Sequence, residues 1–471
     1  LCIRHKPGTD VALLNGFMSV LISEDLYDKD FVAERTENFE ELKEAVLEYP
    51  PDKAAGICGV TASEIVQAAH LLAENHPGAL IYAMGITQHI TGYQHVLSCA
   101  NLQMLLGNIG VPGGGIAPLR GSDVTGSGVL AHVYPGYQKV TDPAAQEKFE
   151  KAWGVPLSDK IGLMVVGMVD AAGAGQVKAM YVMGENPMMS NPDLNHVEKC
   201  LKSLDFLVVQ DVFLTETAQL ADVVLPAAGW AEENGTVINS ERRMQLVNKA
   251  IEPPGEARPD WQIICDLAKR MLGVIPDAPY GGWHYAHPAE IMDEIAALCP
   301  VFGGVCYSRL KQSPQWPCPN PDHPGTSILH VGKFSRGLGH FSGVKWQPPA
   351  EKPGKRYPFM LTTGRVLYHW HTGTITRHSK GLDAICPEAV VELNTEDASR
   401  LAIADGQMVR ISSRRGEVTA KAQVGGKVKP GIVFMPWHFH EAAANLLTSA
   451  ALDPVAGIPE YKAVAVRLEK A

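Results

Sequence analysis

The sequence predicts the α/β fold class, with two doubly wound α/β domains followed by a C-terminal β-barrel. Over the first 340 residues, short apolar runs alternate with helical patterns, as in parallel sheets covered by helices. Residues 311–356 are rich in Pro, Gly, Gln and Lys, which is typical of a covering loop and a domain boundary. The rest of the chain consists of short strands with tight turns, the pattern of a small barrel.

Individual elements follow from local patterns. Thr61 and Glu64 form a capping-box pattern ahead of a helix, and Pro77 follows that helix. An apolar run at residues 79–85 predicts a buried strand, and a long helical stretch follows at about 93–107. The same strand pattern recurs in the runs at 178–184, 205–211 and 221–226.

Polar residues follow three of the predicted strands. In doubly wound sheets, ligands bind beyond the carboxyl ends of the strands, so these residues predict one extended ligand. Chance placement stays an alternative, because loops are polar in any case. The residues are Thr87, Gln88 and His89 after the first strand, Glu185, Asn186 and Pro187 after the second, and Asp211, Thr215, Glu216 and Thr217 after the third.

The composition argues against several classes of protein. A formal net charge of −10 disfavours a nucleic-acid-binding surface, and no apolar run is long enough for direct membrane insertion. None of the nine cysteines lies in a CxxC pair, so no zinc or iron–sulfur ligand set is recognisable. Scattered thiols predict a reducing, cytoplasmic location. The chain opens at Leu1 without a signal peptide, so we expect a fragment of a longer protein, and a periplasmic location stays an alternative.

Five glycines lie between Gly107 and Gly115, and Arg120 follows them on the same loop. Glycines let backbone N–H groups approach a ligand closely, and arginine offers a rigid, charged fork for a carboxylate or phosphate. Together they predict a site for a large phosphorylated cofactor beside a small anion. A surface loop with a solvated arginine is the alternative.

Asp10 follows the turn Pro7–Gly8–Thr9. Its carboxylate could accept hydrogen bonds from both N1–H and N2–H of a guanine, a bidentate match. It could equally cap the helix that begins with the residues VALLNG. The residues alone leave these two roles open.

Three further motifs keep alternatives. Residues 126–131 superficially fit the dinucleotide fingerprint, but no β run precedes them, which argues against a nicotinamide cofactor. Residues 233–245 predict either a hairpin with a salt-bridged rim or a phosphate or pterin contact. Two HxH pairs, at 369–371 and 438–440, could form a four-imidazole metal site if they lie on barrel strands. The alternative is hydrogen-bonded histidines along a ligand cleft.

An ordered series of motifs runs through the whole chain and resembles one family. The resemblance is to the catalytic α subunit of molybdenum- or tungsten-dependent formate dehydrogenases, in the molybdopterin oxidoreductase (dimethyl sulfoxide reductase) family. The motifs include PGTDVALLNG, MGITQHITG, LLGNIGVPGGG, APLRG, VYPGYQ, MGENP, ADVVLPAAGWAEENGTVIN, DWQII and PEYKAVAVR.

The resemblance implies an oxidoreductase that interconverts formate and CO2 at a Mo or W centre held by two molybdopterin guanine dinucleotides. It implies a partial molybdopterin-binding α/β domain at 1–120 and a second molybdopterin-binding α/β domain at 121–345. Residues 346–471 would form the molybdopterin dinucleotide-binding β-barrel.

The resemblance also implies roles for individual residues. Arg120 resembles the active-site arginine that orients formate, and Asp10 resembles the carboxylate that selects guanine. The other residues that resemble cofactor contacts are Met84, Gly85 and Gln88; Gly184, Glu185, Asn186, Asp211 and Thr215; and Arg365, His369, His371, Asn445, Tyr461 and Lys462.

The chain also departs from the family's pattern. The family's N-terminal part, with its [4Fe–4S] cluster and its Cys or selenocysteine metal ligand, has no counterpart here, so we expect this fragment alone to be inactive. The implied electron partners are an iron–sulfur or flavin subunit, or hydrogenase subunits. Residues 121–125 replace a Gln/Asn-rich stretch beside the substrate. The alternatives are therefore another molybdopterin oxidoreductase with a different small substrate, or a cofactor-less scaffold subunit of a redox complex.

Overall fold

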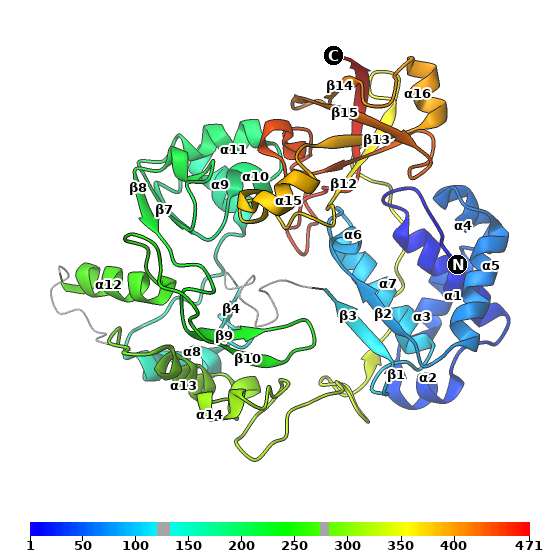
Figure 1. Cartoon of the computed structure of the whole chain (residues 1–471). Helices are drawn as coiled ribbons and strands as arrows, with labels where there is room; N and C mark the ends of the chain where they lie inside the picture. The colour runs from blue at the N-terminus through cyan, green and yellow to red at the C-terminus, as the bar shows by residue number, and fades with distance from the viewer. Residues whose placement is uncertain (120–131, 274–281) are drawn as a thin grey trace. The chain divides into compact units, whose positions relative to one another are not determined.

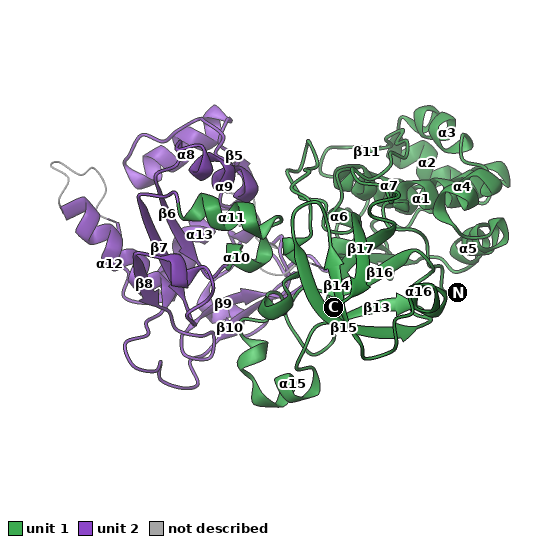
Figure 2. Cartoon of the chain, turned by 90° about the horizontal axis from the view of Figure 1, so that it is seen from above, with its two compact units in different colours: residues 1–118, 186–202, 328–471 green, residues 119–185, 203–327 purple. Residues whose placement is uncertain are grey.

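The computed structural model of the protein describes residues 1–119, 132–273 and 282–471. Its helices and strands confirm the predicted α/β class, and its last part confirms the predicted C-terminal β-barrel (Figure 1). The chain forms two compact units, each built from separate stretches of sequence (Figure 2). Unit 1 comprises residues 1–118, 186–202 and 328–471, and unit 2 comprises residues 119–185 and 203–327.

The first part of unit 1 is organised around α1 (Asp10–Ser23), which is buried along most of its length. Its sequence is apolar on nearly every side, so other helices pack around it. The predicted capping box is present, because Thr61 Oγ1 accepts the Glu64 N–H and Glu64 Oε2 accepts the Thr61 N–H. The helices of this part are α2 (Lys29–Arg35), α3 (Phe39–Leu47), α4 (Pro51–Cys58), α5 (Ala62–Glu74), α6 (Met84–Thr87) and α7 (Gly92–Leu105).

The strand predicted at 79–85 is shorter and more exposed than expected. β2 (Ala79–Tyr82) ends before Met84, where α6 begins, and it pairs in parallel with β3 (Gly115–Pro118). Within the described residues this sheet has two strands; Leu80 packs on the helical core at one face, whereas Ile81, on the other face, is 62% exposed. A parallel strand is normally covered on both faces, and this assumption misled the prediction.

The barrel of unit 1 is closed, with the strand order β12-β16-β13-β15-β14-β17. Its strands alternate buried and more exposed residues, and the inward side chains, such as Leu361, Val391 and Val433, form one apolar core. The strands are β12 (Phe359–Gly364), β13 (Val390–Asn394), β14 (Met408–Ser412), β15 (Glu417–Gly425), β16 (Ile432–Pro436) and β17 (Val464–Lys470).

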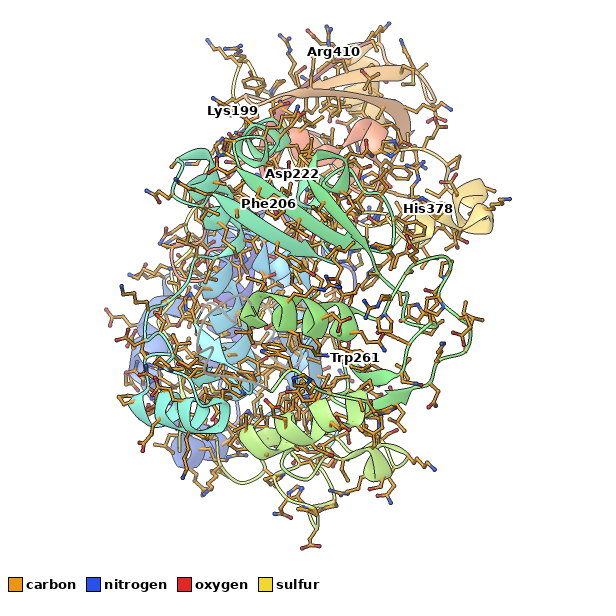
Figure 3. All side chains as sticks on the ribbon, turned by 90° about the vertical axis from the view of Figure 1, so that its left-hand side faces the viewer. Lys199, Phe206, Asp222, Trp261, His378 and Arg410 are labelled. Atoms are coloured by element: carbon orange, nitrogen blue, oxygen red, sulfur yellow. The ribbon has the colours of Figure 1, made fainter. Side chains whose placement is uncertain are left out.

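Unit 2 contains a parallel sheet of order β6-β7-β8. Val182, Leu207 and Val209 pack on one of its faces with η3 (Ala218–Leu220). Phe206, which is labelled in Figure 3, lies on the other face. Its side chain is 46% exposed. The sheet and helices are β6 (Ala179–Met183), β7 (Phe206–Asp211), β8 (Val223–Pro226), α8 (Pro143–Trp153), α9 (Val165–Gly173), α12 (Asp260–Gly273), α13 (Pro288–Leu298) and α14 (Tyr307–Leu310).

The segment 233–245 contains the predicted hairpin. β9 (Gly235–Ile238) pairs antiparallel with β10 (Met244–Val247), and Arg243 forms an ion pair with Glu241 at 3.2 Å. This geometry supports the hairpin with a salt-bridged rim.

In the part of the chain that the structure describes, no single helix is long and apolar enough to cross a membrane. The bent pair α4 and α5 passes that test together, by length and composition.

Candidate functional site

The first group of predicted residues lies in unit 1, at the carboxyl end of β2. Met84 and Gly85 belong to α6, Gln88 follows it, and Asp10 is the first residue of α1. The backbone at Gly85 is exposed, and a Cβ placed there would meet nothing within 4 Å. A ligand can therefore approach this backbone closely, as the sequence predicts for a cofactor contact.

Asp10 has a buried carboxylate that lacks a hydrogen-bonding partner. Thr9 occupies the N-cap position of α1, and no hydrogen bond among the described residues ends on the Asp10 carboxylate, so the capping role is wrong. Oδ1 lies 3.5 Å from His5 Nε2, and Oδ2 is buried without a partner. An unpaired buried carboxylate is costly. A ligand edge with two adjacent N–H donors, such as that of guanine, would satisfy it.

Two buried histidines face Asp10, and one of them, His95, is not among the residues singled out from the sequence. His89 Nε2 and His95 Nδ1 lie 3.9 and 3.8 Å from Asp10 Oδ2. The three residues are the group among the described residues whose ligand atoms could surround a metal ion. His89 Nε2 also lies 3.0 Å from the Gly85 carbonyl oxygen, and His95 Nδ1 lies 2.9 Å from that of Ile86.

These carbonyl contacts decide the protonation of the two rings. A nitrogen that donates to a carbonyl carries the proton and has no lone pair for a metal. Burial lowers the pKa of His89 to about 4, and burial also lowers the pKa of His95. Both rings are therefore neutral near pH 7, and the arrangement is that of hydrogen-bonded histidines beside Asp10. Only the fold brings the three residues together, since His95 is 85 residues from Asp10 in the sequence.

The second group lies in the barrel and contains two cations. Lys462 Nζ donates to the Thr363 carbonyl oxygen at 2.8 Å, and the Arg365 guanidinium lies 4.4 Å from the centre of the Trp370 ring. Burial, and then the charge of Arg365, lower the pKa of Lys462 to about 8. No carboxylate in the described ranges contributes to the electrostatics of either cation. Two neighbouring cations without an acid form a site for an anion such as a phosphate.

Asn445 and Tyr461, both predicted cofactor contacts, bind the protein itself. Asn445 Nδ2 donates to the carbonyl oxygens of Met189 (2.8 Å) and Ser190 (3.2 Å), and its Oδ1 accepts from Thr448. The Tyr461 hydroxyl donates to the Ser190 carbonyl oxygen at 2.8 Å. These side chains therefore fix α10 (Pro187–Ser190) to the barrel within unit 1.

The two HxH pairs follow the ends of β12 and β16, and His440 begins η6 (His440–Ala442), so neither pair lies on a strand as the metal-site hypothesis required. His369 Nε2 lies 2.7 Å from the Cys386 carbonyl oxygen, and its Nδ1 lies 3.3 Å from Thr376 Oγ1. His438 Nδ1 lies 2.5 Å from the His371 carbonyl oxygen. Turns do not keep i and i+2 on one face, and no four-histidine metal site forms within the described chain. Hydrogen-bonded histidines are the interpretation that the structure supports.

The predicted contacts of the second domain lie in unit 2, with one exception. Gly184 and Glu185 follow β6, and Asp211 ends β7, so both strand ends carry polar groups as predicted. Asp211 is buried, and burial and then the charge of Glu185 raise its pKa, against two lowering backbone hydrogen bonds. Thr215 Oγ1 accepts the N–H of Ala218 at the start of η3. The exception is Asn186, which begins the stretch assigned to unit 1 and precedes α10. Arg120 lies outside the described residues.

Gly85 in α6 and Gly92 in α7, both in unit 1, make a matched pair of sites for a stability measurement. A Cβ at Gly92 would collide with the Thr87 carbonyl oxygen, whereas a Cβ at Gly85 meets open space. We expect Gly92→Ala to lower the free energy of unfolding by about 3 kcal/mol, and Gly85→Ala to change it by less than about 0.5 kcal/mol. Urea unfolding followed by circular dichroism measures both. Equal stability of the two variants would contradict the packing described for Gly92.

Comparison with known proteins places the chain in a family. Residues 2–270 match the molybdopterin oxidoreductase family, and residues 359–465 match the molydopterin dinucleotide binding domain. The chain belongs to the molybdopterin oxidoreductase family. The family and its domain confirm the predicted cofactor, a pair of molybdopterin guanine dinucleotides with Mo or W. The [4Fe–4S] cluster stays a prediction.

Individual relatives show which enzymes of this family the chain is similar to. The chain is 48% identical to the F420-dependent formate dehydrogenase subunit alpha of Methanocaldococcus jannaschii, over 98% of this chain and 69% of the relative. It is 40% identical to formate dehydrogenase H of Escherichia coli, over 99% of this chain and 66% of that protein. A nitrate reductase of Symbiobacterium thermophilum is 36% identical. Acetylene hydratase from Pelobacter acetylenicus has the same fold, with a TM-score of 0.75 over 99% of this chain and 71% of its own, at 22% identity.

Proposed function

We propose that this chain is part of the catalytic subunit of a formate dehydrogenase, which interconverts formate and CO2. The identity to formate dehydrogenase α subunits, 48%, 47% and 44% for three methanogen proteins, supports this function over nitrate reduction, for which two relatives are 35% and 36% identical. The cofactor pair supplies the two-electron redox chemistry when it is bound. The protein's own residues hold the cofactor and orient the substrate.

The observation that carries the cofactor assignment is that unit 1 contains two places whose charged groups lack partners: a buried carboxylate and a pair of cations. Asp10 presents a buried carboxylate oxygen without a donor, and Lys462 and Arg365 present cations without a described acid. A guanine dinucleotide offers what both places lack, two adjacent N–H groups at one end and a pyrophosphate in its middle. Open backbone at Gly85 and Gly184 allows close approach of a ligand. These residues fit the cofactor.

For the substrate, the proposal rests on Arg120. Formate is a one-carbon anion, so a protein can recognise little besides its charge and its two oxygens. A guanidinium donates two parallel N–H···O bonds to such a carboxylate and fixes its orientation. We therefore assign Arg120 the role of holding formate, with Asp211, Glu185, Thr215 and Asn186 on the side of the second dinucleotide.

The remaining parts of the proposal concern partners. Formate dehydrogenase relatives support transfer of electrons to a partner in general terms. We propose an iron–sulfur or flavin subunit, or hydrogenase subunits, as that partner, and a [4Fe–4S] cluster in sequence outside this chain as the exit from the active site. We also propose a cytoplasmic location.

The proposed function is tested on the complete enzyme that contains this chain. Metal analysis, pterin analysis and viologen-linked assays with formate and with nitrate are carried out on one preparation. We expect Mo or W, two pterin guanine dinucleotides per chain, and viologen reduction by formate only. Nitrate reduction without formate oxidation would assign a different substrate within the family. A protein without metal and pterin would instead be the cofactor-less scaffold subunit.

A further inference from the structure

Glu460 is a fully buried carboxyl group in the segment that enters the last barrel strand. Its Oε2 accepts the Ala350 N–H at 2.9 Å, and its Oε1 accepts the Ile90 N–H at 3.5 Å. Among the described residues, the group at ion-pair distance is His89, whose Nδ1 lies 3.9 Å from Oε1. Burial raises the pKa of Glu460, against the backbone hydrogen bonds from Ala350 and Ile90, which lower it.

His89 supplies the matching half of this pair. Its Nε2 lies 3.0 Å from the Gly85 carbonyl oxygen, which places the ring proton on Nε2 and leaves Nδ1 as a lone-pair acceptor. Nδ1 is buried and has no hydrogen-bond partner. A buried acceptor without a donor therefore faces a buried acid that can provide one. The 3.9 Å between His89 Nδ1 and Glu460 Oε1 exceeds a hydrogen bond by about 1 Å.

The pair lies between two groups of proposed cofactor contacts. Glu460 immediately precedes Tyr461 and Lys462, whereas His89 immediately follows Gln88. A second carboxylate links the same two segments of the chain. Asp453 Oδ2 accepts the Tyr93 N–H, in the first turn of α7, at 2.9 Å. Carboxylates are favourable at a helix N-terminus. The segment that carries Lys462 is thus attached to the segment that carries Gln88, within unit 1.

We propose that the Glu460 carboxyl donates its proton to His89 Nδ1, and that the two act as positioning residues. They fix Lys462 relative to Met84, Gly85 and Gln88, so that one dinucleotide meets both groups. This inference rests on the proposed function for its ligand, but the shared proton is a property of the chain alone.

The shared proton is tested by infrared difference spectroscopy on the complete enzyme that contains this chain, at pH 7. We expect wild type to show the C=O stretch of a buried protonated carboxyl group, and Glu460→Gln to lack it. Asp397→Asn is the matched control: Asp397 is also buried in the barrel region, but it pairs with Arg400 at 2.6 Å and should contribute no such band. A wild-type spectrum without the Glu460 band would overturn the shared proton.

The positioning role is tested by the pterin content of the complete enzyme that contains this chain, after expression in a host that makes the cofactor. Glu460→Met removes the donor and should lower the pterin content about tenfold, as for partners that orient ligand groups. Glu460→Gln keeps an N–H donor for Nδ1 and should retain most of the pterin, as should Asp397→Asn. Equal pterin in Glu460→Met and Glu460→Gln, whether high or low, would overturn the role. Wild type without pterin would instead overturn the proposed function.

Discussion

Replacement of Arg120 by alanine in the complete enzyme is expected to lower kcat/KM for formate by about 100-fold or more. Two charge-assisted hydrogen bonds to a carboxylate contribute about 1.5–3 kcal/mol each, and about 1.4 kcal/mol corresponds to a factor of ten. Since formate offers no other group to hold, both binding and orientation should suffer, so KM rises and kcat falls. Steady-state kinetics with a viologen acceptor measures both constants.

The control for this prediction is Arg120→Lys, which keeps the charge but not the two-pronged geometry. We expect it to recover part of the binding, seen in KM, and little of kcat. Metal and pterin content must match wild type in both variants, so that the loss is assigned to the substrate. Wild-type kinetics in Arg120→Ala would remove Arg120 from the active site.

The second large effect concerns Lys462 and pH. Its pKa in the ligand-free chain is lowered to about 8, below the usual lysine value, by burial and by Arg365. A bound phosphate stabilises the charged ammonium and raises that pKa, so binding above pH 8 requires uptake of a proton. The affinity for GDP should therefore be constant below pH 8 and fall about tenfold per pH unit above it. Titration calorimetry from pH 7 to 9 measures this slope.

Two variants separate Lys462 from the titration of GDP itself. Lys462→Met should bind GDP about tenfold more weakly at pH 7, because a charge-assisted contact is lost, and should lose the slope. Lys462→Arg should bind tightly and also lose the slope, since a guanidinium stays charged throughout this range. A slope unchanged in Lys462→Met would show that Lys462 does not contact the nucleotide.

Local patterns sufficed for much of the fold. The capping box at Thr61 and Glu64, the strand at β7 and the short strands of the barrel depend on residues close together in sequence, and the structure has them. The apolar run at 79–85 predicts a buried strand, whereas burial depends on what covers each face of the sheet, and Ile81 is exposed. The HxH spacing was likewise uninformative without knowing that β12 and β16 end first.

The residues of the candidate site could likewise be predicted only in part from the sequence. Asp10, Gly85 and Gln88 belong to recognisable motifs, so the sequence could point to them. Glu460 also lies in a recognisable motif, PEYKAVAVR, but its role, like that of His95, depends on residues far away in the chain; Glu460 and Ile90 are 370 positions apart. The adjacency of Glu460 to Tyr461 and Lys462 was a local signal within that motif. Asn445 was predicted to contact a cofactor, but its partners in α10 lie about 255 positions away.

The closed barrel and the open sheet of unit 2 differ in whether they offer free strand edges to other chains. Each barrel strand has a neighbour on both sides, so the barrel presents no strand edge for another molecule to extend. In the described part of unit 2, β6 and β8 are outer strands of a sheet that also exposes Phe206. When the chain is produced by itself, intermolecular β-pairing should therefore begin at this sheet and not at the barrel.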